Sequence, residues 1–179
     1  CNTVVSTKTG LGLADFVGTE AGFCADLGAE KFLDIKCRKA GISPDTIVLV
    51  ATIKALKYHG GVPKDQVFEK NDEALKKGLE NLERHAKNLN GYGVNVIVCL
   101  NKFTTDTKEE IKIVEKFVKD MGMEFSLSTA YVDGGKGAED LAHKVVESCD
   151  KNKKKDFHFL YQDDMPVVEK IKKVCYEIY

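Results

Sequence analysis

The chain has 179 residues, of which 43% are hydrophobic and 31% are charged, which fits one globular domain or one domain with an appendage. Its net charge of −1 gives no reason to expect nucleic acid or an anionic membrane surface as a partner. No apolar run approaches the roughly 18–20 residues of a membrane span, and no signal-peptide pattern opens the chain.

Four short apolar segments predict β-strands. In chain order they cover residues 16–19, 46–51, 94–100 and 124–127. The first is the weakest, because Gly18 interrupts it. Residues 94–100 are almost all apolar, as expected for a strand that is covered on both faces.

Helical periodicity occupies most of the remaining chain. Apolar residues recur at spacings of three and four over 72–90, 111–121, 141–149 and 167–178. The second helix is expected to begin at Thr107, whose hydroxyl can cap it while Glu110 reaches back in a capping box. Strands that alternate with helices predict an α/β fold with a mainly parallel sheet and flanking helices, a three-layer architecture of the Rossmann-like or P-loop-NTPase-like kind.

The domain organisation is expected to change near residue 150. Residues 1–150 form the α/β region in this interpretation, and 151–179 form a linker and a C-terminal helix of a neighbouring region. The charged run Lys151–Lys155 is typical of a solvated linker. Because the chain opens at Cys1 rather than Met and stops within a helical pattern, we expect it to be a piece of a longer protein.

The six cysteines form neither a C-x-x-C pair nor a zinc-ligand spacing. We therefore expect reduced thiols, a cytoplasmic protein and no metal site. No serine, histidine and carboxylate set has the spacing of a triad, so no catalytic residue is assigned.

A cationic, glycine-ended segment follows strand 46–51. Lys57, His59, Gly60 and Gly61 come after its carboxyl end, where ligands bind in parallel α/β sheets. Positive charge and close backbone approach suit an anion, but an ordinary basic strand-to-loop turn explains the segment equally well.

A second glycine-rich segment precedes the third helix. Gly134 and Gly135 place backbone N–H groups where they can hold an anion at a helix start. A plain glycine-rich turn is the simpler alternative.

Two aromatic residues follow neighbouring strands. Phe103 lies in a string that is similar to the base-reading N-K-x-D motif, but Thr104 replaces the aspartate, which argues against guanine binding. Tyr131 follows the next strand, so the two rings can clamp a flat heterocycle. The alternatives are a phenylalanine packed under its own loop and a surface tyrosine.

The string Val50–Gly61 closely resembles the signature VAT[IV]RALK.[HN]GG of formate–tetrahydrofolate ligases, with Lys54 in place of the usual arginine. The resemblance extends over essentially the whole chain. Further strings that carry it are Cys1-Asn2, Thr19–Phe32, Asp34–Arg38, Asn101–Thr107, Gly134–Gly137 and Phe159–Tyr161.

The resemblance implies a one-carbon-metabolism ligase that uses ATP and Mg²⁺, commonly with a monovalent cation, and that is usually a homotetramer in bacteria. In such enzymes formate attacks the γ-phosphate to give formyl phosphate and ADP, and N10 of tetrahydrofolate then takes the formyl group as phosphate leaves. No nucleic-acid or membrane partner is implied.

The resemblance also implies site residues. The folate ring is expected between Phe103 and Tyr131, where the family usually has Trp at the second position. Phe23 and Asp26 belong to a string expected beside the nucleotide, in which Cys24 replaces a glycine. Asp26 is alternatively a helix cap.

Family members carry a P-loop upstream of the segment that matches this chain, and the chain has none of its own. We therefore expect this piece alone to be inactive, with the remainder of the same polypeptide as its partner. The competing interpretation is a non-catalytic folate- or nucleotide-binding or interaction module of the same fold.

Overall fold

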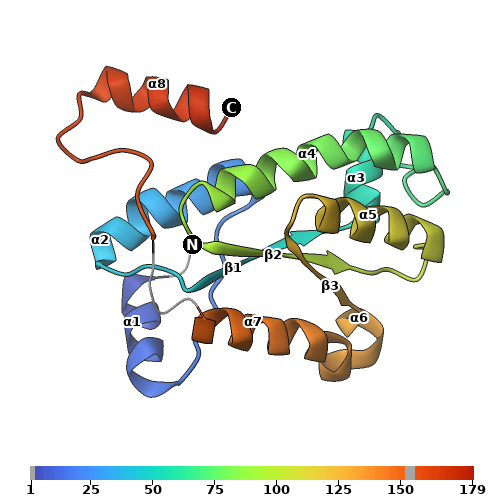
Figure 1. Ribbon diagram of the computed structural model, residues 1–179, viewed down its shortest axis with the longest axis horizontal. Helices are drawn as coiled ribbons and strands as arrows, with labels where there is room; N and C mark the ends of the chain where they lie inside the picture. The colour runs from blue at the N-terminus through green and yellow to red at the C-terminus, as the bar shows by residue number, and fades with distance from the viewer. Residues whose placement is uncertain (1–2, 152–155) are drawn as a thin grey trace. The chain divides into compact units, whose positions relative to one another are not determined.

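The computed structural model describes residues 3–151 and 156–179, which form two compact units (Figure 1). Within these ranges, unit 1 comprises residues 3–44, 91–93 and 156–179, and unit 2 comprises residues 45–90 and 94–151. No helix in the described parts of the chain is long and apolar enough to cross a membrane.

Unit 2 is built on a parallel sheet of three strands in the order β1-β2-β3. The strands are β1 (Thr46–Ala51), β2 (Asn95–Asn101) and β3 (Glu124–Ser128). Ala51 is opposite Leu100 in the first pair, and Asn101 is opposite Ser128 in the second. All three strands therefore end at the same edge of the sheet, and the predicted α/β fold with a parallel sheet is confirmed.

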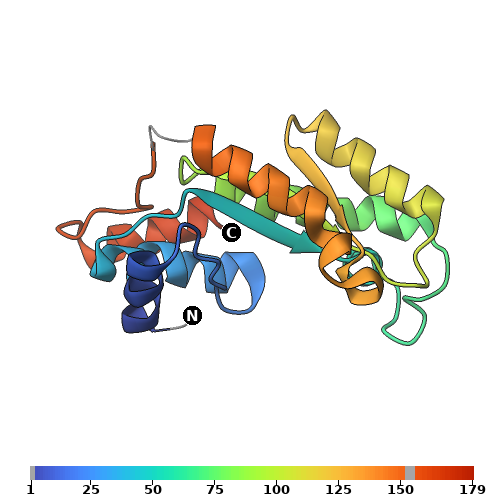
Figure 2. The same cartoon turned by 90° about the horizontal axis from the view of Figure 1, so that it is seen from below.

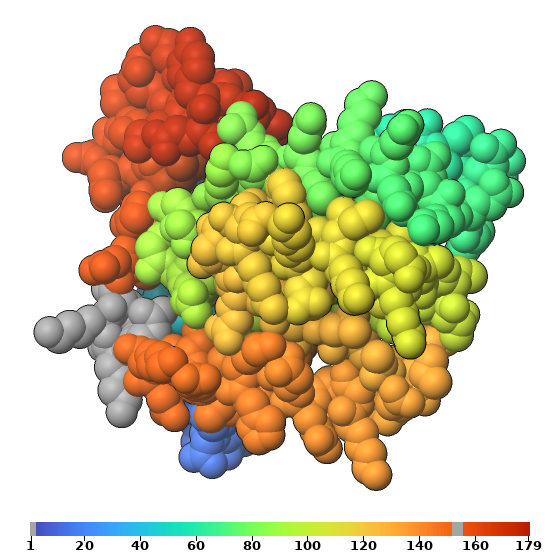
Figure 3. Space-filling model, turned by 45° about the vertical axis from the view of Figure 1, so that its right-hand side comes forward, coloured from blue at the N-terminus to red at the C-terminus, as the bar shows by residue number. Residues whose placement is uncertain are grey.

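Helices cover both faces of this sheet (Figures 1 and 2). The helical elements of unit 2 are α3 (Ile53–His59), α4 (Asp72–Asn90), α5 (Lys108–Asp120), α6 (Ala130–Asp133), the 3₁₀ turn η3 (Gly134–Ala138) and α7 (Glu139–Lys151). α4 and α5 lie on one face and α7 on the other, which gives unit 2 three layers. Figure 3 shows the outer surfaces of α5 and α7, in yellow and orange.

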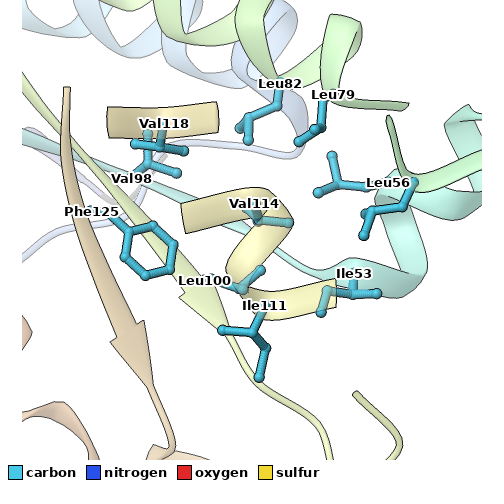
Figure 4. Close-up of a cluster of buried hydrophobic side chains, with 12 residues drawn as sticks. Ile53, Leu56, Leu79, Leu82, Val98, Leu100, Ile111, Val114, Val118 and Phe125 are labelled. Atoms are coloured by element: carbon cyan, nitrogen blue, oxygen red, sulfur yellow. The ribbon is translucent and has the colours of Figure 1, made fainter. Parts of the chain in front are cut away.

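The core of unit 2 lies between the sheet and helices α3, α4 and α5 (Figure 4). Val98 and Leu100 alternate along β2 toward this layer, as the two-residue period of a strand requires. Leu79 and Leu82 of α4 and Val114 of α5 meet them from the helical side. Apolar residues at helical spacing therefore bury one face of each helix against the strands.

The ends of the helices follow local capping chemistry. Thr107 caps α5 by accepting from the Glu110 N–H, and the Glu110 carboxylate accepts from the Thr107 N–H, so the predicted capping box is confirmed. Gly122, after α5, adopts a φ of +73°, a conformation that favours glycine.

Unit 1 is helical in the described residues. Its elements are α1 (Val4–Leu13), the π-helical segments η1 (Cys24–Ala29) and η2 (Lys31–Cys37), the short α2 (Arg38–Ala40) and α8 (Val167–Glu177). The buried Asp34 carboxylate joins the parts of this unit, because it accepts from the Tyr92 hydroxyl at 2.7 Å and from the Leu160 N–H at 2.8 Å.

Two local predictions, and one alternative that the sequence left open, were wrong. Residues 16–19 form no strand; they are irregular and mostly exposed, because Gly18 leaves too little apolar surface to bury. The segment after β1 is the helix α3 rather than a loop, with Thr52 as its cap. Asp26 is no cap, since η1 begins at Cys24 and its first turn has no side-chain cap.

The division of the chain differs from the predicted boundary near residue 150. Residues 156–179 belong to the same unit as residues 3–44. That residues 151–179 belong to a neighbouring region of a longer enzyme stays a prediction. Residues 1–2 and 152–155, which include one family-like string and most of the predicted linker, lie outside the described part of the chain.

Candidate ring-binding site at the carboxyl edge of the sheet

The carboxyl edge of the sheet in unit 2 carries three side chains from three different strand-end segments. Lys54 comes from α3 after β1, Phe103 from the loop after β2, and Tyr131 from α6 after β3. The pairing of β2 with β3 continues one residue past the end of β2, because the Lys102 N–H donates to the carbonyl of Ser128, the last residue of β3, at 2.9 Å. This continued pairing brings the two aromatic segments side by side.

The rings of Phe103 and Tyr131 have centroids 5.8 Å apart and planes inclined by 35°. The ammonium of Lys54 lies 3.8 Å from the Phe103 centroid, a cation–π contact. Tyr131 is 74% exposed, so its ring is held by little besides Phe103 and can move at small cost. Two flat aromatic surfaces and one cation thus form a site suited to a heterocyclic ligand with electron-rich or anionic groups.

The loop that carries Phe103 is held by its own carboxylate. Asp106 accepts the Phe103 N–H at 2.8 Å, which closes the loop over three residues. Partial burial raises the pKa of Asp106 above its ordinary value, although the hydrogen bond from Phe103 opposes that shift. The loop therefore has a defined shape that does not depend on a ligand.

The loop that carries Tyr131 folds back on the end of β3. The Thr129 N–H donates to the Gly137 carbonyl at 2.9 Å. A Cβ at Gly137 would lie 2.4 Å from the Thr129 carbonyl carbon, so this close approach requires glycine. A Cβ at Gly134 or Gly135 would meet nothing within 4 Å, so these two glycines face open space.

Comparison with known proteins identifies the family. The family model described as formate–tetrahydrofolate ligase matches residues 1–179. The chain belongs to the formate–tetrahydrofolate ligase family. It is 53% identical to the formate–tetrahydrofolate ligase of Pelagibacter ubique (strain HTCC1062) and 52% identical to that of Hyphomonas neptunium (strain ATCC 15444).

Both alignments cover the whole of this chain and 32% of each relative. The chain thus spans about a third of the length of these formate–tetrahydrofolate ligases. The resemblance that the sequence strings indicated is confirmed at the level of the family.

The two lysines of α3 lie in different environments. Lys57 is 1% exposed and donates to the Glu110 carboxylate at 3.0 Å and to the Glu69 carbonyl at 2.7 Å. The structure thus places this predicted anion-binding residue inside the protein, whereas Lys54, one turn earlier, lies at the aromatic pair.

The other predicted anion-edge residues of α3 have visible structural partners. Gly60 allows α3 to approach α4, because a Cβ there would lie 1.9 Å from the Ala74 carbonyl oxygen. Gly61 has a φ of +100° and turns the chain away from the helix. His59 is exposed and contacts the Tyr58 ring edge-on at 5.9 Å.

Phe23 and Asp26 belong to unit 1, whereas Phe103 and Tyr131 belong to unit 2. Phe23 is 88% exposed, and the Asp26 carbonyl accepts from the Tyr179 hydroxyl at 3.2 Å. Their place beside a nucleotide stays a prediction. Within residues 3–151 and 156–179, no group of three or more His, Cys, Asp and Glu side chains could hold a metal ion, so no residue is assigned to one.

The sequence interpretation missed two residues of this edge, Lys54 as a neighbour of Phe103 and Glu110 as the partner of Lys57. A signal for Lys54, but not for Glu110, existed in the string Thr52–His59. Its apolar residues Ile53 and Leu56 have helical spacing behind a threonine cap, which points Lys54 and Lys57 along defined directions.

Proposed function

We propose that this chain supplies the tetrahydrofolate-binding edge of an ATP-dependent ligase that joins formate to tetrahydrofolate and yields 10-formyltetrahydrofolate. The family assignment supports the reaction class. The single observation that carries the assignment of the site is the pairing of Phe103 with Tyr131 at 5.8 Å on neighbouring strand ends.

The two rings are too close in this arrangement to hold a ligand ring between them. A heterocycle inserted face to face needs two contact distances of about 3.5 Å, so the surrounding rings must lie about 7 Å apart. Tyr131 is the exposed partner and Phe103 is held by Asp106 and Lys54. The ligand therefore binds by displacing Tyr131 outward while Phe103 stays in place.

In this proposal the folate ring is the part of the substrate that the chain recognises, and N10 is left free to take the formyl group from formyl phosphate as phosphate leaves. The family resemblance implies formate and ATP as further substrates, with Mg²⁺ and a monovalent cation as cofactors. The residues that activate formate lie in the remainder of the polypeptide, so the 179-residue chain alone makes no formyl phosphate. The complete enzyme acts as a homotetramer in the cytoplasm.

The test is calorimetric titration of the full-length protein that contains this chain with tetrahydrofolate. Phe103→Ala and Tyr131→Ala should each raise the Kd roughly ten-fold, because each loses a stacking contact and buried ring area. The Michaelis constant for tetrahydrofolate should rise with it, and that for formate should stay within about two-fold.

Tyr176→Ala is the matched control, since this tyrosine of α8 is 81% exposed and lies in unit 1. Its Kd for tetrahydrofolate should equal that of the unmodified protein within about two-fold. Unchanged affinity in both ring variants, in a folded protein, would show that the pteridine binds elsewhere.

A further inference from the structure

A buried ion pair joins α3, which carries Lys54, to α5, which begins just after the Phe103 loop; Lys54, Phe103 and Tyr131 are called the ring site below. Lys57 of α3 and Glu110 of α5 are 1% and 0% exposed, and their Nζ and Oε1 atoms are 3.0 Å apart. Burial opposes ionisation of Glu110, but hydrogen bonds from Thr107 and Lys57 together hold its pKa below the ordinary value. The carboxylate is therefore charged at neutral pH and is matched by the ammonium of Lys57.

Glu110 connects this ion pair to the loop that carries Phe103. Its second oxygen, Oε2, accepts from the Thr107 N–H at 3.1 Å and from the Thr107 hydroxyl at 2.9 Å. Thr107 directly follows Asp106, which holds the Phe103 N–H. One carboxylate thus fixes both the start of α5 and the end of the aromatic loop.

Lys57 connects the same carboxylate to the cation over the ring. It lies three residues after Lys54 on α3, and its ammonium also donates to the Glu69 carbonyl. Lys54 in turn lies 3.8 Å above the Phe103 ring. These contacts therefore form a closed circuit. It runs along α3 from Lys54 to Lys57, on through Glu110 and Thr107 to the Phe103 loop, and back to Lys54.

The ion pair is a costly way to fill this space. The removal of two charges from water costs desolvation free energy, which their mutual attraction and further hydrogen bonds must offset. Apolar side chains of similar volume often give equal or greater stability. Stability alone therefore gives no reason for charges here. Directional hydrogen bonds do what apolar packing cannot, since they fix the position of α3 against the 103–107 loop.

We propose that Lys57 and Glu110 are positioning residues for the ring site: their buried ion pair holds the Phe103 loop and Lys54 of α3 in the geometry that receives the pteridine ring. The claim that this geometry receives a pteridine ring rests on the proposed function. The claim that the ion pair positions the Phe103 loop is independent of it.

The experiment uses the full-length protein with 4-fluorophenylalanine at position 103 alone. The variants are Lys57→Met, Glu110→Gln and the double variant Lys57→Met/Glu110→Gln. Glutamine keeps one oxygen for Thr107 and removes the charge that Lys57 needs. Lys119→Met/Glu115→Gln is the matched control, because it removes an exposed ion pair from the same helix α5.

The two single variants should shift or broaden the ¹⁹F resonance of residue 103 and raise the Kd for tetrahydrofolate at least five-fold. The double variant should recover much of the Tm lost by Lys57→Met, since it leaves no unpaired buried charge, while it keeps the altered resonance and the weakened binding. The control should change neither. A role confined to stability predicts instead that resonance and affinity recover along with Tm.

An unchanged ¹⁹F resonance in folded Lys57→Met or Glu110→Gln protein would overturn the inference. If Lys57→Met fails to fold, the double variant and Glu110→Gln decide the same question. A resonance that changes as expected in a protein that binds no tetrahydrofolate, even unmodified, would support the positioning role and reject the proposed function, so the two failures are distinguishable.

Discussion

At the scale of single residues, glycines decide how closely the helices of unit 2 approach. A Cβ at Gly78 of α4 would lie 1.8 Å from the carbonyl oxygen of Leu56. This oxygen already accepts the Gly60 N–H at 2.9 Å, so it cannot retreat without breaking the end of α3. The backbones of α3 and α4 are therefore in direct contact, and that contact also holds the helix that carries Lys54 and Lys57.

We expect Gly78→Ala to lower the free energy of unfolding by about 2–3 kcal/mol, because the methyl group forces the helices apart. The measurement is urea denaturation followed by circular dichroism. Gly12→Ala is the control: Gly12 lies in α1 and has nothing within 4 Å of the Cβ position, so helix propensity should make this variant more stable by up to about 1 kcal/mol. Equal effects of the two substitutions would contradict the close approach.

At the scale of elements, the start of α5 combines a capping box with a buried charge. The free energy that Glu110 contributes depends on its ionisation, because the hydrogen bonds from Thr107 and Lys57 favour the carboxylate. A carboxyl group whose pKa is lowered on folding stabilises the protein above its unfolded pKa. That contribution is lost as the pH falls through the lower pKa of the folded state.

Glu110→Gln should therefore cost about 2–4 kcal/mol at pH 7. The difference from the unmodified protein should shrink as the pH falls below the ordinary value of 4.5 for a glutamate. Denaturant titrations at a series of pH values measure this difference. Glu115→Gln, in an exposed ion pair with Lys119 on the same helix, should cost less than about 0.5 kcal/mol at any pH. A pH-independent loss in Glu110→Gln would assign the effect to packing rather than charge.

At the scale of the whole molecule, Asp34 ties together three stretches of chain that are distant in sequence. Its carboxylate bonds to Tyr92 and Leu160, and the guanidinium of Arg38 lies 3.7 Å away. Arg38 also stacks 4.0 Å from the Phe159 ring centroid, which secures the same C-terminal stretch. Burial raises the pKa of Asp34, although the hydrogen bonds from Tyr92 and Leu160 and the Arg38 charge oppose the shift.

We expect Asp34→Ala to lower the free energy of unfolding by about 3 kcal/mol, because it leaves the buried donors of Tyr92 and Leu160 without an acceptor. Proteolysis after residue 156 should accelerate in parallel. Asp163→Ala removes the other carboxylate that pairs with Arg38, at 3.1 Å, but this side chain is 77% exposed. Its cost should stay within about 0.5 kcal/mol. A similar loss in both variants would mean that Asp34 acts only through Arg38.

Local patterns in the sequence sufficed for most of the α/β unit. The apolar run of β1 and the periodicity of α4 give the observed bounds, and the pair Thr107 and Glu110 marks the start of α5. Each of these signals lies within a short stretch of chain, where side-chain period and capping chemistry determine the backbone. The order of the aromatics along the chain also sufficed to place Phe103 and Tyr131 at one edge, since parallel strands end together.

The features that local patterns did not predict depend on contacts between residues that are distant in the sequence. The string after β1 has a threonine cap and two apolar residues at helical spacing, but seven residues make a weak helix signal, and packing of α3 against α4 stabilises the helix. From the sequence alone, Lys57 is expected to be an exposed cation. Its ion pair with Glu110, 53 residues away, allows it to be buried. The sequence by itself determined the family and the α/β pattern. The tertiary structure decided that Lys54 lies at the aromatic pair and that Lys57 is buried, because burial depends on neighbours that are distant in the sequence.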